Sequence, residues 1–352
     1  MNIQMTIEEL RRLERERQEL TAQVSAHLQC RILVLFLILI TLVSSSYLLP
    51  LAYSQEFAYI STWSEFGTEE TSLSSPEGIA VDSSSGNVYV ADTGTNRIQT
   101  FSSNGTFIAE WGRTGTGNGS LSSPRGIALD QAGNVYVADT GNNRIQTFSS
   151  NGTFIAEWGR DGSANGTLRS PEGIAVDSSS GNVYVADTAN NRIKKFSSNG
   201  TFIAEWGRYG GAFENGTLRI PEGIAVDSSS GNVYVADTGN NRIQTFSSNG
   251  TFISKWGGGY DPRAINGSFD RPSDISLGQA GNVYVADTGN NRIQTFSSNG
   301  TFIAEWGRDG SANGTLRSPE GIAVDSSSGN VYVADTDNNR ISVFTSRSPI
   351  GS

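Results

Sequence analysis

The sequence predicts an all-β fold, a six-bladed β-propeller of four-stranded antiparallel blades, preceded by an N-terminal helix and one hydrophobic segment. The 41 glycines, together with abundant Ser, Thr, Asn and Val, indicate many short strands joined by tight turns. A unit of 47 to 51 residues recurs, marked at one end by Pro76, Pro124, Pro171, Pro221, Pro272 and Pro319. Six tryptophans mark its other end: Trp63, Trp111, Trp158, Trp206, Trp256 and Trp306.

Each complete unit contains four segments that predict short strands. In the first complete unit these are residues 78–82, 87–92, 97–101 and 106–111. The first two are apolar on both sides, as expected of strands packed between neighbouring sheets, whereas the fourth is more amphipathic and is expected outermost. Ser-Ser-Asn-Gly joins the last two strands, and its Asn-Gly pair predicts a type I′ hairpin with two residues of positive φ.

The two ends of the repeat region predict how the ring closes. The last unit ends after its third strand, residues 340–345, and lacks a fourth. Residues 59–66, which contain Trp63, form a fourth strand with no unit of their own. We therefore expect the N-terminal strand to complete the sixth blade, because closure leaves no open sheet edge.

The repeated motif resembles a known family. Residues 171–193 read P-E-G-I-A-V-D-x-x-x-G-N-V-Y-V-A-D-T-x-N-N-R-I, and five near copies follow the same pattern. This run resembles the NHL repeat, and the resemblance covers residues 57–345. It implies a platform for protein or RNA, a sensor domain of some bacterial receptor kinases or, rarely, an enzyme. No RING-like cysteine set and no kinase domain accompany the repeats, so the ligase and kinase roles are not carried over.

The N-terminal region predicts membrane targeting. Residues 32–43 are apolar and uncharged, and the stretch 32–53 is long enough for a transmembrane anchor or a signal-peptide core. The predicted domains are a cytoplasmic amphipathic helix (1–31), this segment (32–53), the propeller (57–347) and a short tail (348–352). The propeller is expected outside the cell, anchored by a single pass through the membrane, or secreted if cleavage occurs before Gln55.

The leading helix has its own pattern. Apolar residues fall on the a and d positions of a heptad frame, with Arg and Glu between them: Leu10, Leu13, Leu20 and Val24. This spacing predicts either a short amphipathic helix or a dimerising coil.

Charge and composition limit the chemistry. The formal net charge is −10, and the five Arg and five Glu before residue 54 cancel, so the repeats carry the excess. An acidic body repels phosphate backbones, which argues against nucleic-acid binding. The single cysteine, Cys30, and the single histidine, His27, precede the hydrophobic segment. The repeats therefore hold no Cys/His zinc site, cysteine nucleophile or Ser-His-Asp triad, and an enzyme is the less favoured prediction.

Departures from the repeat are the best places to look for a site. An Asp and an Arg that recur in every unit, such as Asp92 and Arg97, are expected to hold the fold together. By contrast, the residue after each repeat proline varies: Glu77, Arg125, Glu172, Glu222, Ser273 and Glu320. These residues are expected at the axial channel mouth. They predict a solvated acidic rim, with a divalent cation bound by the glutamates as the alternative and no other cofactor.

Two inter-blade loops alone carry large aromatic residues. Their aromatic and basic residues are Tyr209, Phe213, Tyr260, Arg263, Phe269 and Arg271. Such residues contribute strongly to interfaces, although they can also pack beneath their own loops. Asn-x-Ser/Thr sequons in the loops are the better predicted glycosylation sites: Asn118, Asn165, Asn215, Asn266 and Asn313.

The sequence thus predicts an extracytoplasmic scaffold that binds a protein or a glycan. A metal-dependent hydrolase or lyase with a cation at the axis, and a structural component of the cell envelope, are the alternatives.

Overall fold

The computed structural model describes residues 8, 11–12, 14–24, 56–63, 71–258 and 265–347. The chain divides into two compact units, Met1–Ser54 and Gln55–Ser352. In the first unit, residues 14–24 are helical and expose Leu20 and Val24. The predicted hydrophobic segment 32–53 lies outside the described residues. No helix within the described residues is long and apolar enough to cross a membrane.

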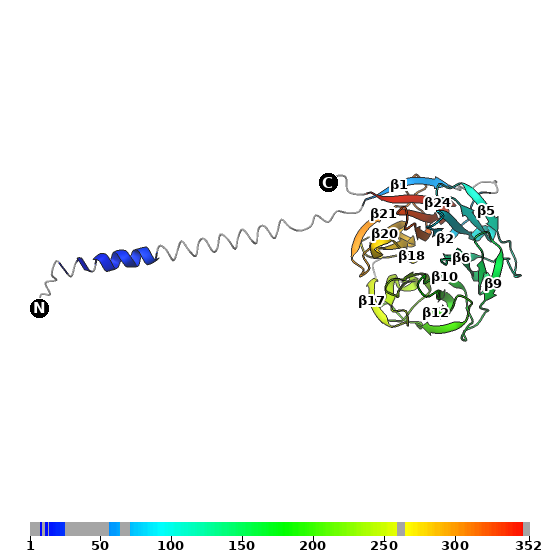
Figure 1. Cartoon of the computed structure of the whole chain (residues 1–352), viewed down its shortest axis with the longest axis horizontal. Helices are drawn as coiled ribbons and strands as arrows, with labels where there is room; N and C mark the ends of the chain where they lie inside the picture. Colours follow the sequence, from blue (N-terminus) through cyan, green and yellow to red (C-terminus); the bar gives the residue numbers. More distant parts are fainter. Residues whose placement is uncertain are drawn as a thin grey trace. The chain divides into compact units, whose positions relative to one another are not determined.

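The second unit is a ring of six four-stranded antiparallel sheets (Figure 1). Blade one contains β2 (Pro76–Asp82), β3 (Asn87–Asp92), β4 (Arg97–Phe101) and β5 (Phe107–Trp111). Blade two contains β6 (Pro124–Leu129), β7 (Val135–Asp139), β8 (Arg144–Phe148) and β9 (Phe154–Trp158). Blade three contains β10 (Pro171–Val176), β11 (Val183–Asp187), β12 (Arg192–Phe196) and β13 (Phe202–Trp206).

The remaining blades follow the same order. Blade four contains β14 (Pro221–Asp227), β15 (Asn232–Asp237), β16 (Arg242–Phe246) and β17 (Phe252–Gly257). Blade five contains β18 (Pro272–Leu277), β19 (Val283–Asp287), β20 (Arg292–Phe296) and β21 (Phe302–Trp306). Blade six contains β22 (Pro319–Val324), β23 (Asn330–Asp335), β24 (Arg340–Arg347) and β1 (Glu56–Trp63).

The predicted closure of the ring is confirmed. The sheet order β1-β24-β23-β22 places the N-terminal strand as the outermost strand of blade six. β1 begins three residues earlier than the sequence pattern indicated, because β24 continues to Arg347 and pairs with Glu56. The first and last strands of the propeller therefore close the ring through backbone hydrogen bonds.

The first strand of each blade lines the axis and contacts the first strands of both neighbouring blades. The fourth strand is outermost, as predicted (Figure 1). A 3-10 turn joins the second and third strands of every blade: η1 (Thr93–Thr95), η2 (Thr140–Asn142), η3 (Thr188–Asn190), η4 (Thr238–Asn240), η6 (Thr288–Asn290) and η7 (Thr336–Asn338). A further turn, η5 (Gln279–Gly281), joins the first two strands of blade five.

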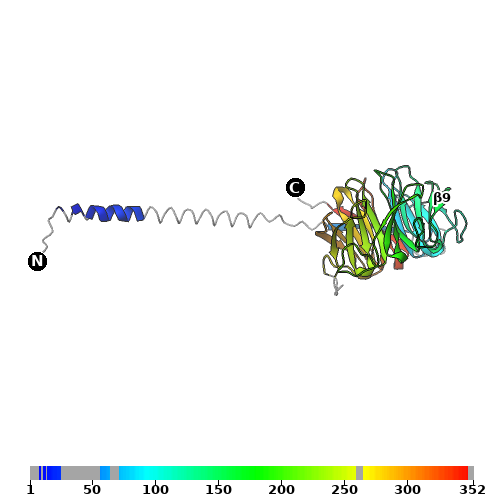
Figure 2. The same ribbon diagram turned by 90° about the horizontal axis from the view of Figure 1, so that it is seen from below.

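The antiparallel order decides which connections share a face. The 3-10 turns lie at the same end of the sheets as the loops that run from the fourth strand of one blade to the first strand of the next. We call this end the connecting-loop face. Figure 2 shows the propeller from its edge, with loops projecting on both sides of the strands.

The predicted type I′ hairpin is wrong. In the turn of residues 102–106, only Gly105 has a positive φ, of 86°, and Asn104 does not. The N–H of Gly105 donates to the carbonyl of Ser102 at 2.9 Å, and the N–H of Ser102 donates to the carbonyl of Thr106 at 2.8 Å. This is a type I turn followed by a left-handed glycine, with a β-bulge at Phe101. The other four Asn-Gly hairpins share it.

The glycine of this hairpin is needed for packing as well as for its backbone angles. Trp111, on the outermost strand of blade one, covers Gly152 in the hairpin of blade two. A Cβ added at Gly152 would lie 2.6 Å from the indole ring. The same indole borders the apolar cluster between blades one and two, which includes Tyr89 and Val137. The recurring Trp and Asn-Gly are therefore two halves of one inter-blade contact.

The recurring Asp and Arg hold the connecting loops to the blades, as predicted. In blade four, Asp237 is buried and accepts hydrogen bonds from the N–H of Arg219 at 2.7 Å and from Nε of Arg242 at 2.6 Å. Arg242 also donates to the carbonyl of Thr217 in the same loop. The remaining five blades repeat the Asp–Arg pair. The loop that arrives from the previous blade is thereby fixed by charge-assisted hydrogen bonds.

Candidate functional site

The variable residues after the repeat prolines meet at the axis on the connecting-loop face. They line a cavity of about 60 Å³ together with the residues that follow them on the first strands. This volume exceeds the 10–15 Å³ or so that one water molecule requires. The predicted axial group, from Glu77 to Glu320, is therefore brought together by the fold.

One arginine serves two of the four axial glutamates. Nε of Arg125 lies 3.0 Å from Oε2 of Glu77, and one of its terminal nitrogens lies 3.1 Å from Oε2 of Glu172. Four of the other five blades have a glutamate where blade two has Arg125, so blade two supplies the cation that pairs with Glu77 and Glu172. Burial by itself lowers the pKa of Arg125, but the surrounding glutamates produce a net increase.

On the opposite side of the ring, cations act at longer range, since Arg125 and Arg271 oppose the rise in the pKa of Glu320. Among the described residues, no side chain forms an ion pair with Glu222 or Glu320. Ser273 lies between them in the ring, and its hydroxyl donates to the carbonyl of Glu320 at 2.8 Å. The axial ring is therefore asymmetric, with an ion-paired half and an unpaired acidic half.

Burial and mutual repulsion raise the pKa values of the axial glutamates and so favour their protonated forms. Burial raises the pKa of Glu222 to about 9, and the charges of Glu172 and Glu320 add to the increase. Burial likewise raises the pKa of Glu77 to about 7, although Arg125 opposes the rise. The pKa values of Glu172 and Glu320 are also raised by burial. Burial and the neighbouring glutamates thus favour the neutral form of Glu222, whose carboxyl group can donate a hydrogen bond as well as accept one.

Sequence reasoning missed Asp274, which also lines the cavity. The other five blades have glycine at this position, and a Cβ at Gly78 would lie 1.8 Å from the carbonyl oxygen of Arg125. In blade five, the side chain of Asp274 instead accepts hydrogen bonds from the N–H of Ile275 at 2.8 Å and of Ile322 at 3.0 Å. Burial raises its pKa to about 7. The signal was present, since only blade five reads Pro-Ser-Asp where four others read Pro-Glu-Gly.

The aromatic loop residues divide into two groups. Tyr209 and Phe213 are 66% and 78% exposed in the loop between blades three and four. Phe269 is 1% exposed and packs against Phe296 with ring centroids 5.4 Å apart, so its assignment to the ligand face is wrong. It replaces the buried leucine of the other loops, such as Leu218, and fills the same inter-blade pocket.

Of the remaining predicted loop residues, Arg271 is exposed. Tyr260 and Arg263 lie outside the described residues. The asparagines of all five loop sequons are exposed.

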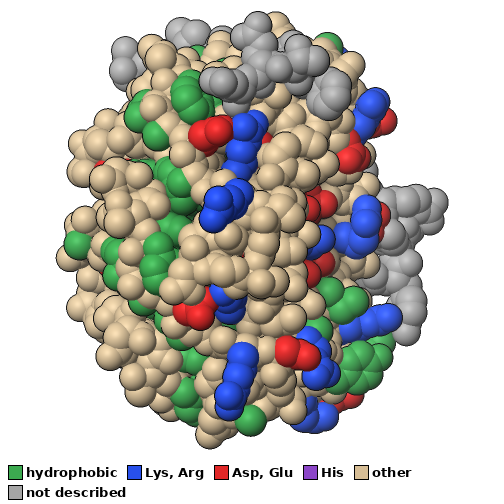
Figure 3. All heavy atoms as spheres, turned by 90° about the vertical axis from the view of Figure 1, so that its right-hand side faces the viewer, with side chains coloured by type: hydrophobic (Ala, Val, Ile, Leu, Met, Phe, Trp, Pro, Cys, Tyr) green, Lys and Arg blue, Asp and Glu red, His purple; other side chains and the backbone are tan. Residues whose placement is uncertain are grey.

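The outer rim of the propeller, formed by the fourth strands, carries a further set of exposed apolar residues. Each of five outermost strands exposes one isoleucine: Ile60, Ile108, Ile155, Ile203 and Ile253. On the rim that Figure 3 shows, hydrophobic side chains form a column with charged side chains of both signs beside it. Because these isoleucines recur from blade to blade, they do not distinguish one part of the rim as a site.

A comparison with protein-family models finds six NHL repeats in the chain. They match residues 73–101, 121–148, 168–196, 218–246, 269–296 and 316–344. The chain belongs to the NHL-repeat family. The matched segments begin in each connecting loop and end with the third strand, so they include the Asp–Arg pairs and the axial residues. A comparison with curated protein sequences finds no match.

Solved structures similar to this NHL propeller include proteins of several kinds. A protein of unknown function from Bacteroides thetaiotaomicron superposes with a TM-score of 0.65 at 16% identity, covering 83% of this chain and 76% of that one. A gluconolactonase from Xanthomonas campestris superposes with a TM-score of 0.59 at 14% identity, covering 78% of this chain and 87% of that one. A streptogramin B lyase gives 0.57 at 17% identity, covering 83% and 98%. At these identities the likeness shows the fold alone.

Proposed function

We propose that this NHL propeller is a binding scaffold that holds a protein partner on its connecting-loop face, outside the cell. The observation that carries the proposal is the exposure of Tyr209 and Phe213 on a single loop. The loop between blades two and three is two residues shorter, and aligning the two loops from each end places Asp161 and Ser163 at the equivalent positions. Exposed aromatic residues that depart from a repeat are typical of interaction sites.

The loop that presents these aromatics is held in place. Nζ of Lys255 donates to the carbonyls of Ala212 and Phe213, both at 3.1 Å. Arg242 donates to the carbonyl of Ala212 at 2.6 Å. A loop whose backbone is already fixed loses less conformational entropy on binding, which favours affinity.

The charges nearby indicate the chemistry of the partner. Arg219 and Arg271 are exposed on the connecting-loop face. The side chain of Arg208 is 75% exposed and forms an exposed ion pair with Glu214, at 3.3 Å. A protein segment that combines apolar and acidic side chains complements this surface. The location outside the cell rests on the hydrophobic segment 32–53.

The alternative functions have less support. The lyase and lactonase among the similar structures share only the fold. Among the described residues, no group of three or more His, Cys, Asp or Glu is arranged to hold a metal ion. The propeller sequence also has no histidine, whereas one similar structure is a catalytically inactive histidine-to-alanine variant of virginiamycin B lyase from Staphylococcus aureus. No observation specifically favours a structural envelope component.

The test uses the full chain as bait for a displayed library of random peptides. We expect enriched peptides to carry acidic and apolar residues, and Tyr209→Ala with Phe213→Ala to weaken their binding about tenfold or more. The matched control, Ile203→Ala with Ile253→Ala, removes equally exposed apolar residues from the rim and leaves binding unchanged.

Failure to enrich any peptide, or equal binding by both double variants, contradicts the proposal. A glycan array gives the competing outcome, since glycan binding that depends on Tyr209 and Phe213 would replace the protein partner with a glycan.

A further inference from the structure

The chain contains ten Asn-Gly dipeptides in two structural settings. Five lie in the hairpins between third and fourth strands: Asn104, Asn151, Asn199, Asn249 and Asn299. Five lie in the connecting loops: Asn118, Asn165, Asn215, Asn266 and Asn313. In an Asn-Gly dipeptide, the backbone nitrogen of glycine can attack the side-chain amide carbon of asparagine, because glycine has no Cβ to obstruct the approach. A hydrogen bond that holds the glycine N–H opposes this attack.

The hairpin dipeptides are held at both reacting groups. The N–H of Gly105 donates to the carbonyl of Ser102 at 2.9 Å, and the other four hairpins repeat this bond. Oδ1 of Asn104 also accepts hydrogen bonds from the hydroxyls of Ser102 and Thr106, at 2.6 and 2.9 Å. Both the nucleophile and the electrophile are therefore fixed.

Three of the five loop dipeptides are held by a glutamine on the third strand. Oε1 of Gln146 accepts the N–H of Gly119 at 2.9 Å in blade two. Gln244 and Gln294 do the same for the glycines of blades four and five, at 3.0 and 2.8 Å. Nε2 of each glutamine donates to a carbonyl of the same loop, so the amide group matches the loop with both of its polar atoms.

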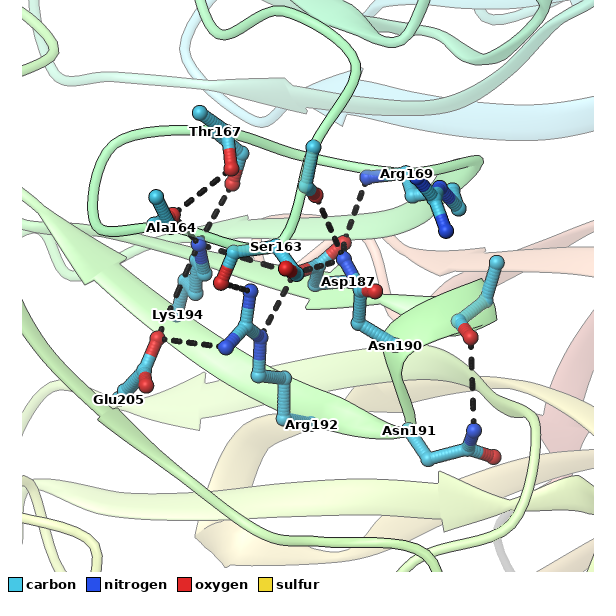
Figure 4. Close-up of polar contacts among 12 residues, drawn as sticks. Ser163, Ala164, Thr167, Arg169, Asp187, Asn190, Asn191, Arg192, Lys194 and Glu205 are labelled. Atoms are coloured by element: carbon cyan, nitrogen blue, oxygen red, sulfur yellow. Dashed lines mark hydrogen bonds and ion pairs between the residues drawn. The ribbon is translucent and has the colours of Figure 1, made fainter.

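Blades three and six lack this glutamine. Lys194 takes its place in blade three, and Nζ donates to the carbonyls of Ala164 and Thr167, both at 2.6 Å (Figure 4). An ammonium group has no acceptor, so it replaces only the donating half of glutamine. In blade six the position is Ser342, whose hydroxyl donates to Asp335 at 3.4 Å. No group within the described part of the chain accepts the N–H of Gly166 or Gly314.

We propose that Asn165 and Asn313 are sites of spontaneous deamidation in the folded protein. The backbone nitrogen of Gly166 loses its proton to water and forms a bond to Cγ of Asn165, closing a succinimide ring. The bond from Cγ to Nδ2 breaks, and ammonia leaves. Water then opens the ring to give aspartate or isoaspartate. Asn313 reacts in the same way with Gly314.

Exposure does not separate the loop sites, since the asparagines of all five are exposed. The loop sites differ instead in whether the N–H of the glycine after each asparagine has a hydrogen-bond acceptor. Each event adds a negative charge to the connecting-loop face and removes an Asn-Gly-Thr sequon. The inference is independent of the protein-binding function proposed above.

The experiment incubates the folded full chain at mildly alkaline pH and follows each asparagine by peptide mass spectrometry. We expect Asn165 and Asn313 to deamidate about fivefold faster than the other three loop sites, which corresponds to the roughly 1 kcal/mol of one hydrogen bond. A sample in denaturant gives the intrinsic rate of each dipeptide, against which the folded rates are normalised.

Two reciprocal variants test the cause. Lys194→Gln supplies an acceptor to the N–H of Gly166. It is expected to slow the deamidation of Asn165 about fivefold and to leave the deamidation rate of Asn313 unchanged. Gln146→Lys removes the acceptor of the Gly119 N–H and is expected to speed the deamidation of Asn118. Thermal unfolding of each variant confirms that the fold is kept. Equal normalised rates at all five loop sites, or an unchanged rate at Asn165 in folded Lys194→Gln, would overturn the proposal.

Discussion

Two charged rings run around this propeller, and they differ in how their carboxylates are satisfied. The first ring consists of the Asp–Arg pairs that recur in every blade. Each Asp accepts hydrogen bonds from an Arg and from the backbone of a connecting loop, as Asp237 does from Arg242 and Arg219. At the axis, Arg125 forms ion pairs with Glu77 and Glu172, whereas Glu222 has no ion pair among the described residues. The pairs that recur in every blade therefore build the scaffold, whereas the axial position, where the blades differ, leaves groups available to a ligand.

The largest expected effect is the loss of one buried Asp–Arg pair. Asp237→Ala leaves Arg242, which is 1% exposed, without its counter-charge. Removing one partner of a buried pair costs about 3–5 kcal/mol of the free energy of unfolding, measured in denaturant. The control Glu214→Ala breaks an exposed pair and is expected to cost under about 1 kcal/mol. Similar losses in the two variants would refute the scaffold role of the repeated pairs.

The axial ring is expected to destabilise the fold as pH rises. The pKa of Glu222 is about 9 in the folded chain, against an ordinary value of 4.5. Between these values the unfolded chain has lost a proton that the folded chain keeps, so the free energy of unfolding falls with increasing pH. Glu222→Gln cannot ionise and is expected to be more stable at neutral pH by about 1–2 kcal/mol, with a flatter pH profile.

Denaturant unfolding of both proteins at several pH values checks this expectation. A variant that follows the wild-type profile would mean that Glu222 ionises normally. Glu214→Gln, on the exposed loop, serves as the control that leaves the profile unchanged.

The smallest expected effect concerns Ile220, a residue that differs from the other blades and has a strained backbone conformation. Ile220 precedes the repeat proline with a φ of 49°, a left-handed conformation that β-branched residues rarely adopt. Four blades have serine at this position: Ser75, Ser123, Ser170 and Ser318. Ile220→Ser is therefore expected to raise the free energy of unfolding by about 0.5–1 kcal/mol, detectable as a higher Tm. Ser170→Ile is the reciprocal change, and its expected effect is a loss of similar size.

The architecture could be predicted because its signals are local and repeated. The order of apolar strands, the Asn-Gly turns and the missing fourth strand of the last unit were sufficient for six blades and the closing strand. The hairpin geometry was not predictable from Asn-Gly alone, because that pair fits both a type I′ turn and a type I turn with a left-handed glycine. Register with the neighbouring strand and the packing of Trp111 on Gly152 select the second.

The candidate site was predictable only in outline. The varying residue after each proline located the axial ring. Neither the bridging of Glu77 and Glu172 by Arg125 nor the exposure of Phe213 beside a buried Phe269 could be inferred, because these depend on distances between blades. The sequence of blade five marks Asp274 as a departure from the repeat, but its hydrogen bond with the N–H of Ile322, 48 residues away, appears only in the folded chain.

By itself, the sequence determined the unit, the number of blades and the strand that closes them, since these follow from periodicity within each unit. Only the tertiary structure decided which departures face a cavity, which face solvent and which fill a core. It also decided which loop amides find a glutamine, because Gly119 and Gln146 are 27 residues apart and meet only when the blade forms. Hydrogen bonds and burial depend on such proximity, which a one-dimensional pattern does not contain.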